Sequence, residues 1–137
     1  MVRYVFLWKE EERRGLADGL KDRPCAIILA SKPRADGSTE VVLCPITHTP
    51  PNDSQTAVAI PTRVSRALGL DDEQSWIKTH QINTLIWPEA QIPFGITPAR
   101  PGEWSFGRLP QALGKAAFEQ VRNNAKAGQL QSVQRKD

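Results

Sequence analysis

The sequence lacks the features that define several large classes of protein. No apolar run approaches the roughly 18 residues of a membrane span, so we expect no membrane association. Only two of the 137 residues are cysteines, too few for a disulfide scaffold, which favours a reduced, cytoplasmic protein. No glycine-rich phosphate loop and no GxSxG motif is present. These absences argue against a membrane protein, a phosphate-loop enzyme and a common serine hydrolase.

Metal-ligand spacing is missing as well. His48, His80, Cys25 and Cys44 form no CxxC or HxxxH pair, so we expect no metal and no cofactor. The two cysteines are predicted to be buried, reduced thiols, although paired strands could bring them face to face. The excess of 18 Lys and Arg over 15 Asp and Glu gives a net charge of +3. Such a charge allows binding to a phosphate polymer without requiring it.

Short apolar segments separated by turns dominate the first half of the chain. Residues 3–8 form an apolar, β-rich stretch that predicts a strand rather than a signal peptide, because charged residues follow it at once. The run 24–30 is typical of a buried strand, and 40–47 is its expected return strand. Asp36-Gly37 between them suits a tight turn, so we predict an antiparallel hairpin.

The remaining elements complete a mainly β domain of the size expected for one globular unit. The pattern predicts strands over 57–60, 75–87 and 103–108, of which the second is long, with a charged loop over 9–22 and an extended loop over 88–101. It also predicts a helical turn over 63–68, with Thr62 as N-cap and Gly69 as stop. A helix over 110–127, closed by Gly128, follows. We expect a single domain over 1–128 with a frayed polar tail over 129–137. Short antiparallel strands with one packing helix favour a small curled sheet or partly closed barrel.

Polar residues at the strand ends are the candidate chemistry. Arg23 directly precedes the buried strand and Thr47 ends its partner, so antiparallel pairing brings both to one end of the sheet. A guanidinium fork fits a phosphate, and a threonine hydroxyl can hold a second oxygen. His80 adds an imidazole that titrates near neutral pH. The alternative is an arginine that is solvated or salt-bridged. Candidate substrate contacts beside them are Lys78, His48, Thr49, Gln81 and Asn83.

Three blocks of the sequence resemble the MazF/PemK (Kid-like) toxins of bacterial toxin–antitoxin systems. The blocks are RPCAIILA at 23–30, LCPIT at 43–47 and INTLIW at 82–87. They occur in the family's order and span about half of the chain. The resemblance implies an SH3-like, partly open barrel with a C-terminal helix, like that of PemK, MazF and CcdB, which is usually a homodimer.

The same resemblance implies an activity. Family members are metal-independent endoribonucleases that cut single-stranded mRNA with the RNA's own 2′-OH as nucleophile, and a cognate antitoxin neutralises them. Arg23 carries over as the catalytic group that stabilises or protonates the cleaved phosphate, and Thr47 as its hydroxyl partner. No protein nucleophile, metal or cofactor is then needed.

The chain departs from the family pattern in three places. No Gly-Asp precedes the 5–8 segment, His80 stands where some members have an aspartate, and Lys78 stands where some have an arginine. Histidine could act as the base and lysine could hold phosphate. A second hypothesis is therefore a non-catalytic barrel of this fold that binds a protein target or acts as a regulatory partner, and a third is an unrelated adaptor barrel. We expect any cleavage specificity to differ through the 9–22 loop, which lies over the groove in this architecture.

Overall fold

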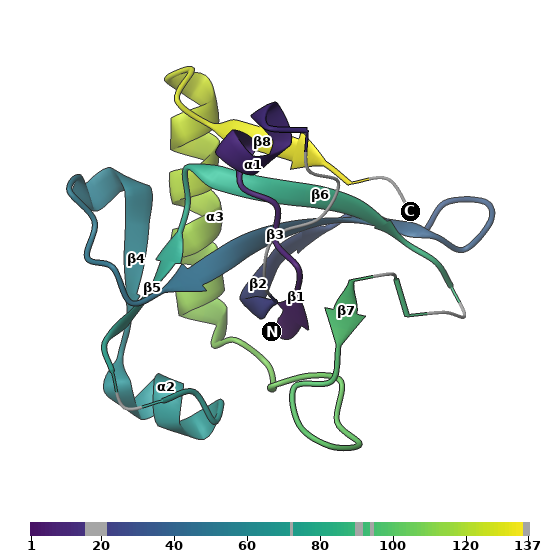
Figure 1. Cartoon of the computed structure of the whole chain (residues 1–137), viewed down its shortest axis with the longest axis horizontal. Helices are drawn as coiled ribbons and strands as arrows, with labels where there is room; N and C mark the ends of the chain where they lie inside the picture. The colour runs from purple at the N-terminus through teal and green to yellow at the C-terminus, as the bar shows by residue number, and fades with distance from the viewer. Residues whose placement is uncertain (16–21, 72, 90–91, 94, 136–137) are drawn as a thin grey trace.

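The computed structural model describes residues 1–15, 22–71, 73–89, 92–93 and 95–135. Its elements, in chain order (Figure 1), are β1 Val2–Tyr4, α1 Lys9–Arg13, β2 Arg23–Ala30, β3 Thr39–Thr47, a 3-10 turn Ser54–Thr56, β4 Ala57–Ile60, α2 Thr62–Ala67, β5 Ser75–Lys78, β6 Gln81–Trp87, β7 Ile96–Thr97, α3 Gln111–Lys126 and β8 Gln131–Gln134. No helix among these residues is long and apolar enough to cross a membrane.

Strand β3 is the centre of the sheet. It pairs antiparallel with β2 on one side, and on the other with β6 along its first part and with β5 at its end. Beyond β5, the sheet ends at β4. Beyond β2, it continues through β1 and ends at β7, and beyond β6 it ends at β8. These described strands do not close into a full barrel (Figure 1). The expected fold class, mainly β with a C-terminal helix and a partly open barrel, is confirmed.

The predicted antiparallel hairpin of β2 and β3 is confirmed. Cys25 lies opposite Pro45, and the turn between the strands places Gly37 at a φ of +82°. Pro45 sits where the partner of β3 changes from β6 to β5. Because proline has no N–H to donate, this change of partner is a position where a strand tolerates it.

Two apolar clusters fill the two faces of the sheet. The first lies beneath α3, which packs across the sheet behind β3 in the view of Figure 1, and includes Cys44, Ile46, Ile77, Ala117 and Val121. The second lies on the other face and includes Tyr4, Phe6, Cys25, Leu43 and Leu85. The two thiols are free and buried as predicted, but on opposite faces, so they do not meet. Burial raises the pKa of the Cys25 thiol to about 12.

The predicted long strand over 75–87 is wrong, because the chain breaks between β5 and β6. Thr79 is fully buried at the break, its N–H donates to the Thr56 carbonyl at 2.9 Å, and its hydroxyl donates to Gln120 at 2.7 Å. These two hydrogen bonds of Thr79 take the place of the strand-to-strand bonds that would continue β5 into β6. They also turn β6 away from β5 and towards the first half of β3.

The predicted charged loop over 9–22 begins instead as helix α1. The Glu11 carboxylate accepts from the Trp8 N–H at 3.0 Å, and Lys9 pairs with Glu12 at 2.8 Å, so local contacts overcome the weak helix signal. Residues 16–21 of the predicted loop lie outside the described residues. The expected effect of the 9–22 loop on cleavage specificity stays a prediction.

The predicted frayed tail is wrong over residues 131–135. Strand β8 pairs in parallel with β6, burying Val133 and Arg135. Val133 is the single apolar residue of β8, so the sequence gives little strand signal there. The strand forms because β6 offers free backbone groups at its edge for pairing.

Smaller differences concern element ends. The first strand stops at Tyr4, and Thr62 is the first residue of α2 rather than its cap. The expected strand over 103–108 is reduced to isolated bridges, one of which joins Val2 to Ser105. The strand over 57–60, the stop at Gly69 (φ +73°) and the helix ending before Gly128 (φ +72°) are as predicted.

Candidate active site

An indole ring between two cations forms the centre of the candidate site. The Arg23 guanidinium carbon lies 4.9 Å from the centre of the Trp8 ring, and the Lys78 ammonium nitrogen lies 5.2 Å from it. Phe6 supports the indole edge-on, with ring centres 4.9 Å apart. A cation over an aromatic face is electrostatically favourable, so Trp8 holds two like charges near each other.

Arg23 has unused hydrogen-bonding capacity. It begins β2 opposite Tyr4, and its Nε is buried without a hydrogen-bond partner among the residues that the structure describes. Within the described residues, no carboxylate forms an ion pair with Arg23 or Lys78, so the salt-bridged arginine that the sequence left open is not found there. Buried donors are almost always paired, so an unpaired one is typical of a site that awaits a ligand.

Lys78 is electrostatically linked to Arg23, and His80 in turn to Lys78. Burial, and then the charge of Arg23, lower the pKa of Lys78. Burial, and then the charge of Lys78, lower the pKa of His80 below its usual 6.5, while the Thr56 backbone and Asp53 act in the opposite direction. His80 is therefore a neutral imidazole at pH 7, able to accept a proton. Its Nδ1 is buried, and no described residue forms a hydrogen bond with it.

A cavity opens beside these two side chains. Its volume is about 260 Å³. The walls come from the loop between β3 and β4 and from the ends of β4 and β5: Thr49, Pro50, Pro51, Asn52, Asp53, Thr56, Ala57, Lys78 and His80. It combines two basic groups, one carboxylate and an apolar proline wall, which is the mixture expected of a small polar ligand site.

Thr47 and Thr49 lie at the mouth of the hairpin. The Thr47 hydroxyl oxygen accepts from the Thr49 N–H at 3.1 Å. The β2–β3 register ends at Cys25 opposite Pro45, and two further steps of the same register would set Arg23 opposite Thr47, on one face of the sheet. Thr49 lines the same cavity as Lys78 and His80.

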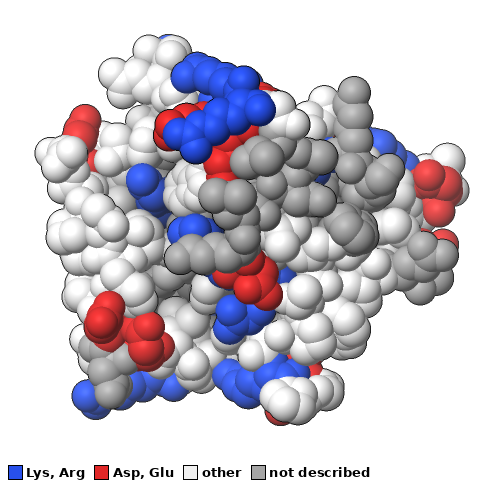
Figure 2. Space-filling view, in the orientation of Figure 1, with Lys and Arg blue, Asp and Glu red and all other residues white. Residues whose placement is uncertain are grey.

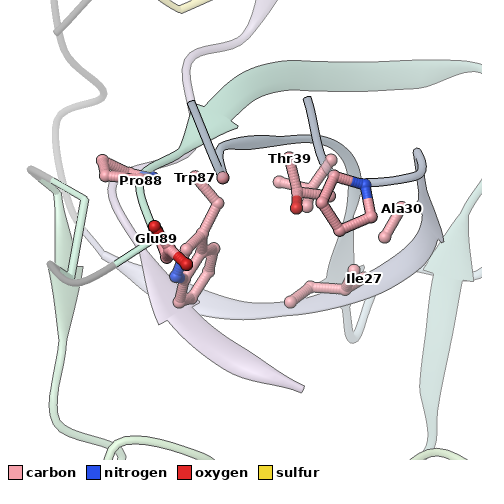
Figure 3. A pocket seen from close by; sticks show the side chains of 9 residues that line it. Ile27, Ala30, Thr39, Trp87, Pro88 and Glu89 are labelled. Atoms are coloured by element: carbon pink, nitrogen blue, oxygen red, sulfur yellow. The ribbon is translucent and has the colours of Figure 1, made fainter. Parts of the chain in front are cut away.

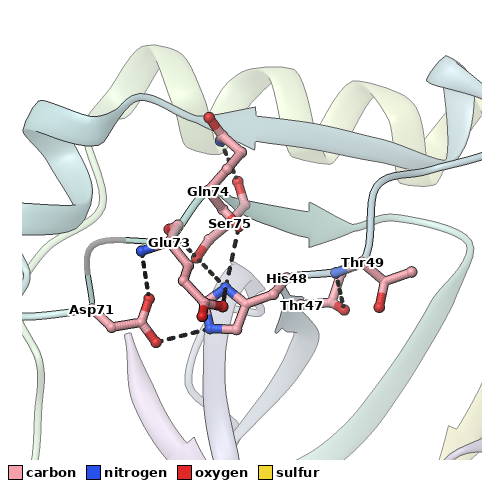
Figure 4. Close-up of polar contacts among 7 residues, drawn as sticks. All are labelled: Thr47, His48, Thr49, Asp71, Glu73, Gln74 and Ser75. Carbon is pink, nitrogen blue, oxygen red and sulfur yellow. Dashed lines mark hydrogen bonds and ion pairs between the residues drawn. The ribbon is translucent and has the colours of Figure 1, made fainter.

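His48 turns away from this group. Figure 4 shows its ring facing Asp71, Gln74 and Ser75, with Nε2 at 2.8 Å from the Asp71 carboxylate and Nδ1 at 3.1 Å from the Gln74 carbonyl. The Gln74 carbonyl first, and then the Asp71 and Glu73 carboxylates, raise the pKa of His48 against the opposing effect of burial. His48 and Thr49 lie in the bend that follows β3, where the Thr49 N–H is bonded back to the Thr47 hydroxyl oxygen.

Gln81 and Asn83 contact the segment that carries Trp8. The Gln81 side chain accepts from the Lys9 N–H at 3.2 Å. Asn83 is fully buried; it accepts from the Leu7 N–H at 2.9 Å and donates to the Leu7 carbonyl at 2.8 Å. Both side chains therefore bond to the backbone of the segment around Trp8, and Asn83, unlike Gln81, is closed off from solvent.

A second cavity differs in character from the one beside Lys78 and His80. Its volume is about 480 Å³, and it lies at the far end of the hairpin, lined by Ile27, Trp87, Glu89 and their neighbours without a lysine or arginine (Figure 3). On the face shown in Figure 2, basic and acidic side chains are interspersed. The paired cations at Trp8 therefore stand out by their geometry on one ring and not by a broad basic patch on that face.

One family model matches the chain. It describes the PemK-like, MazF-like toxins of type II toxin–antitoxin systems and covers residues 14–90, more than half of the sequence. The chain therefore belongs to this family, whose members are generally endoribonucleases and act with an antitoxin partner. No curated protein and no solved structure matches it.

The matched range includes Arg23, Thr47, Lys78 and His80. Trp8 precedes it and is not among the predicted site residues. A tryptophan next to an apolar strand is usually a core residue, so the sequence alone gives no signal that assigns Trp8 to a site.

Proposed function

We propose that this chain is a metal-independent endoribonuclease that cuts single-stranded RNA, with Arg23, Thr47 and His80 as catalytic residues. The observation that supports it is the pair of cations on Trp8, free of ion-paired carboxylates among the described residues and adjacent to a neutral histidine. A phosphate in the cleaved backbone supplies the negative charge that this arrangement lacks. Thr49 holds the substrate beside it, and Lys78 both contacts the phosphate and donates the proton that the leaving oxygen takes up.

The proposed reaction needs only the substrate's own nucleophile. His80 accepts the proton of the ribose 2′-OH, whose oxygen forms a bond to the adjacent phosphorus. The bond from phosphorus to the 5′ oxygen breaks, and that oxygen takes a proton from Lys78, leaving a 2′,3′-cyclic phosphate and a 5′-hydroxyl. Arg23 and the Thr47 hydroxyl bind the oxygens on which charge develops. The lowered pKa of Lys78 makes it a better acid than an ordinary lysine.

The form of the cavity favours an unpaired strand. A volume of about 260 Å³ beside Lys78 and His80 accommodates one base next to the cleaved phosphate, with Asp53 and Thr49 at its polar edge. A base can enter such a cavity only when it is out of a duplex stack.

The family also suggests the partners of the protein. We propose that a cognate antitoxin blocks this groove and that the toxin acts as a homodimer in the cytoplasm. Size-exclusion chromatography with light scattering, with and without the antitoxin, measures both associations.

The test is cleavage of a mixed-sequence single-stranded RNA by purified protein in EDTA, with mapping of the new ends. We expect 5′-hydroxyl ends, and loss of cleavage in Arg23→Ala but not in Arg63→Ala, which removes an exposed arginine of α2. A folded wild-type protein that leaves the RNA intact contradicts the proposal. Growth inhibition that persists in Arg23→Ala would instead favour a barrel that poisons a protein target.

A further inference from the structure

We propose that Arg135, directly after β8, is a positioning residue for the site, which it serves by fixing the segment that carries Trp8. The proposal rests on the proposed function for its activity readout. It also makes a separate structural prediction. Arg135 and Trp8 both lie outside residues 14–90, so the family match does not assign either of them.

Arg135 contacts the Trp8 segment directly. Its guanidinium donates to the Val5 carbonyl at 2.7 Å and to the Asn83 side-chain oxygen at 3.1 Å. Its guanidinium carbon also lies 4.9 Å from the centre of the Tyr4 ring, and Tyr4 is the residue opposite Arg23 in the sheet. The residue is only 8% exposed, so these contacts are shielded from water.

Asn83 extends the same network to Leu7. The oxygen that accepts from Arg135 also accepts from the Leu7 N–H, while the amide nitrogen of Asn83 donates to the Leu7 carbonyl. The backbone is thus held at Val5 and Leu7, immediately before Trp8. Between β1 and α1, the Val5 and Phe6 amides donate to the Gly95 and Tyr4 carbonyls, and Trp8 bonds locally, its N–H to the Glu11 carboxylate and its carbonyl to the Glu12 N–H. These bonds of Trp8 stay within the turn that begins α1, whereas those of Val5 and Leu7 tie the segment to Arg135 and to Asn83 of β6.

Stability alone does not favour an arginine at this position. Burying a guanidinium is costly unless its donors are satisfied, and an apolar side chain would fill the space without that cost. Arginine instead supplies two directed hydrogen bonds. One goes to the Val5 carbonyl, within the segment, and the other to the Asn83 oxygen, which itself binds Leu7. Small displacements of a positioning element are sufficient to reduce catalysis strongly, so the effect should appear in cleavage.

The experiment compares Arg135→Met and Arg135→Lys with Gln134→Met, a matched control because Gln134 is the exposed neighbour of Arg135 at the end of β8. Three quantities are measured below the unfolding temperature of each variant: RNA cleavage, the indole N–H resonance of Trp8, assigned with Trp8→Phe, and hydrogen exchange of the Leu7 amide. For Arg135→Met we expect a loss of kcat of about tenfold to 100-fold. We also expect a shifted Trp8 resonance and faster exchange at Leu7, with unchanged exchange in β2 and β3. Arg135→Lys should recover part of each effect, and the control should match wild type.

The outcomes separate the two proposals. Normal Leu7 exchange and an unmoved Trp8 resonance in Arg135→Met overturn the positioning role. So does faster exchange throughout the sheet in both Arg135 variants, because that is a general loss of stability. If wild-type protein does not cut RNA but the Trp8 and Leu7 changes occur, the positioning role stands and the proposed function fails.

Discussion

Replacing Arg23 by methionine should leave the protein at least as stable as wild type while removing its activity. Three terms decide the stability. Losing the cation–aromatic contact with Trp8 costs about 0.5–2 kcal/mol. Removing the buried, unpartnered Nε recovers about 1–3 kcal/mol. The charges of Arg23 and Lys78 are at most about 10 Å apart, since each lies about 5 Å from the same ring, and their repulsion is about 0.4–1.7 kcal/mol.

The favourable terms exceed the unfavourable one. Because Arg23 is only half-buried, solvent screening reduces the gain, and we expect a net stabilisation of about 1 kcal/mol. For a chain of 137 residues this raises the unfolding temperature by about 3–4 °C. Cleavage should fall about 100-fold or more, because the charge that stabilises the transition state is gone.

Urea unfolding and RNA cleavage, measured on the same preparations, test this reasoning. Arg63→Met provides the control, since an exposed arginine should change stability by less than about 0.5 kcal/mol. A variant destabilised by more than about 1 kcal/mol would show that Arg23 is a structural residue, and retained cleavage would refute its catalytic role.

Three further predictions use other side chains. Trp8→Leu should weaken binding of a fully 2′-O-methylated RNA about tenfold by fluorescence anisotropy, whereas Trp104→Leu, at an exposed ring, should not. The cleavage rate should rise with pH as His80 loses its proton, at a pKa below 6.5, and fall again at high pH as Lys78 loses its proton, at a pKa below 10.5. If His80→Gln keeps the rise at acidic pH, His80 is not the base. The raised pKa of His48 gives stability that is full below pH 6.5 and lost as pH rises through the folded value. The unfolding free energies of wild type and His48→Gln should therefore converge at alkaline pH, with cleavage unchanged.

The hairpin could be predicted from sequence because its signals are local. A continuous apolar run, an Asp-Gly turn and a second apolar run within 25 residues determine both the pairing and the ends of β2 and β3. The same pairing led to Arg23 as a candidate. Local patterns were also sufficient for β4 and for α3.

The parts that could not be predicted depend on distant partners. Strand β8 has little β signal of its own and forms on an edge made by β6, about 50 residues earlier. The break at Thr79 depends on bonds to Thr56 and Gln120. Whether Trp8 belongs to a core or to a site depends on which charges approach it, and those charges come from β2 and β5.

The bond from Arg135 to Val5 joins residues 130 positions apart, and this separation has a consequence during protein synthesis. The ribosome makes Val5 early and Arg135 only after α3 and β8. Until then, the Val5 carbonyl and the Asn83 oxygen lack this donor. By the positioning role proposed for Arg135, the Trp8 segment of a nascent chain is therefore fixed only once residue 135 has been synthesised, late in the making of this domain.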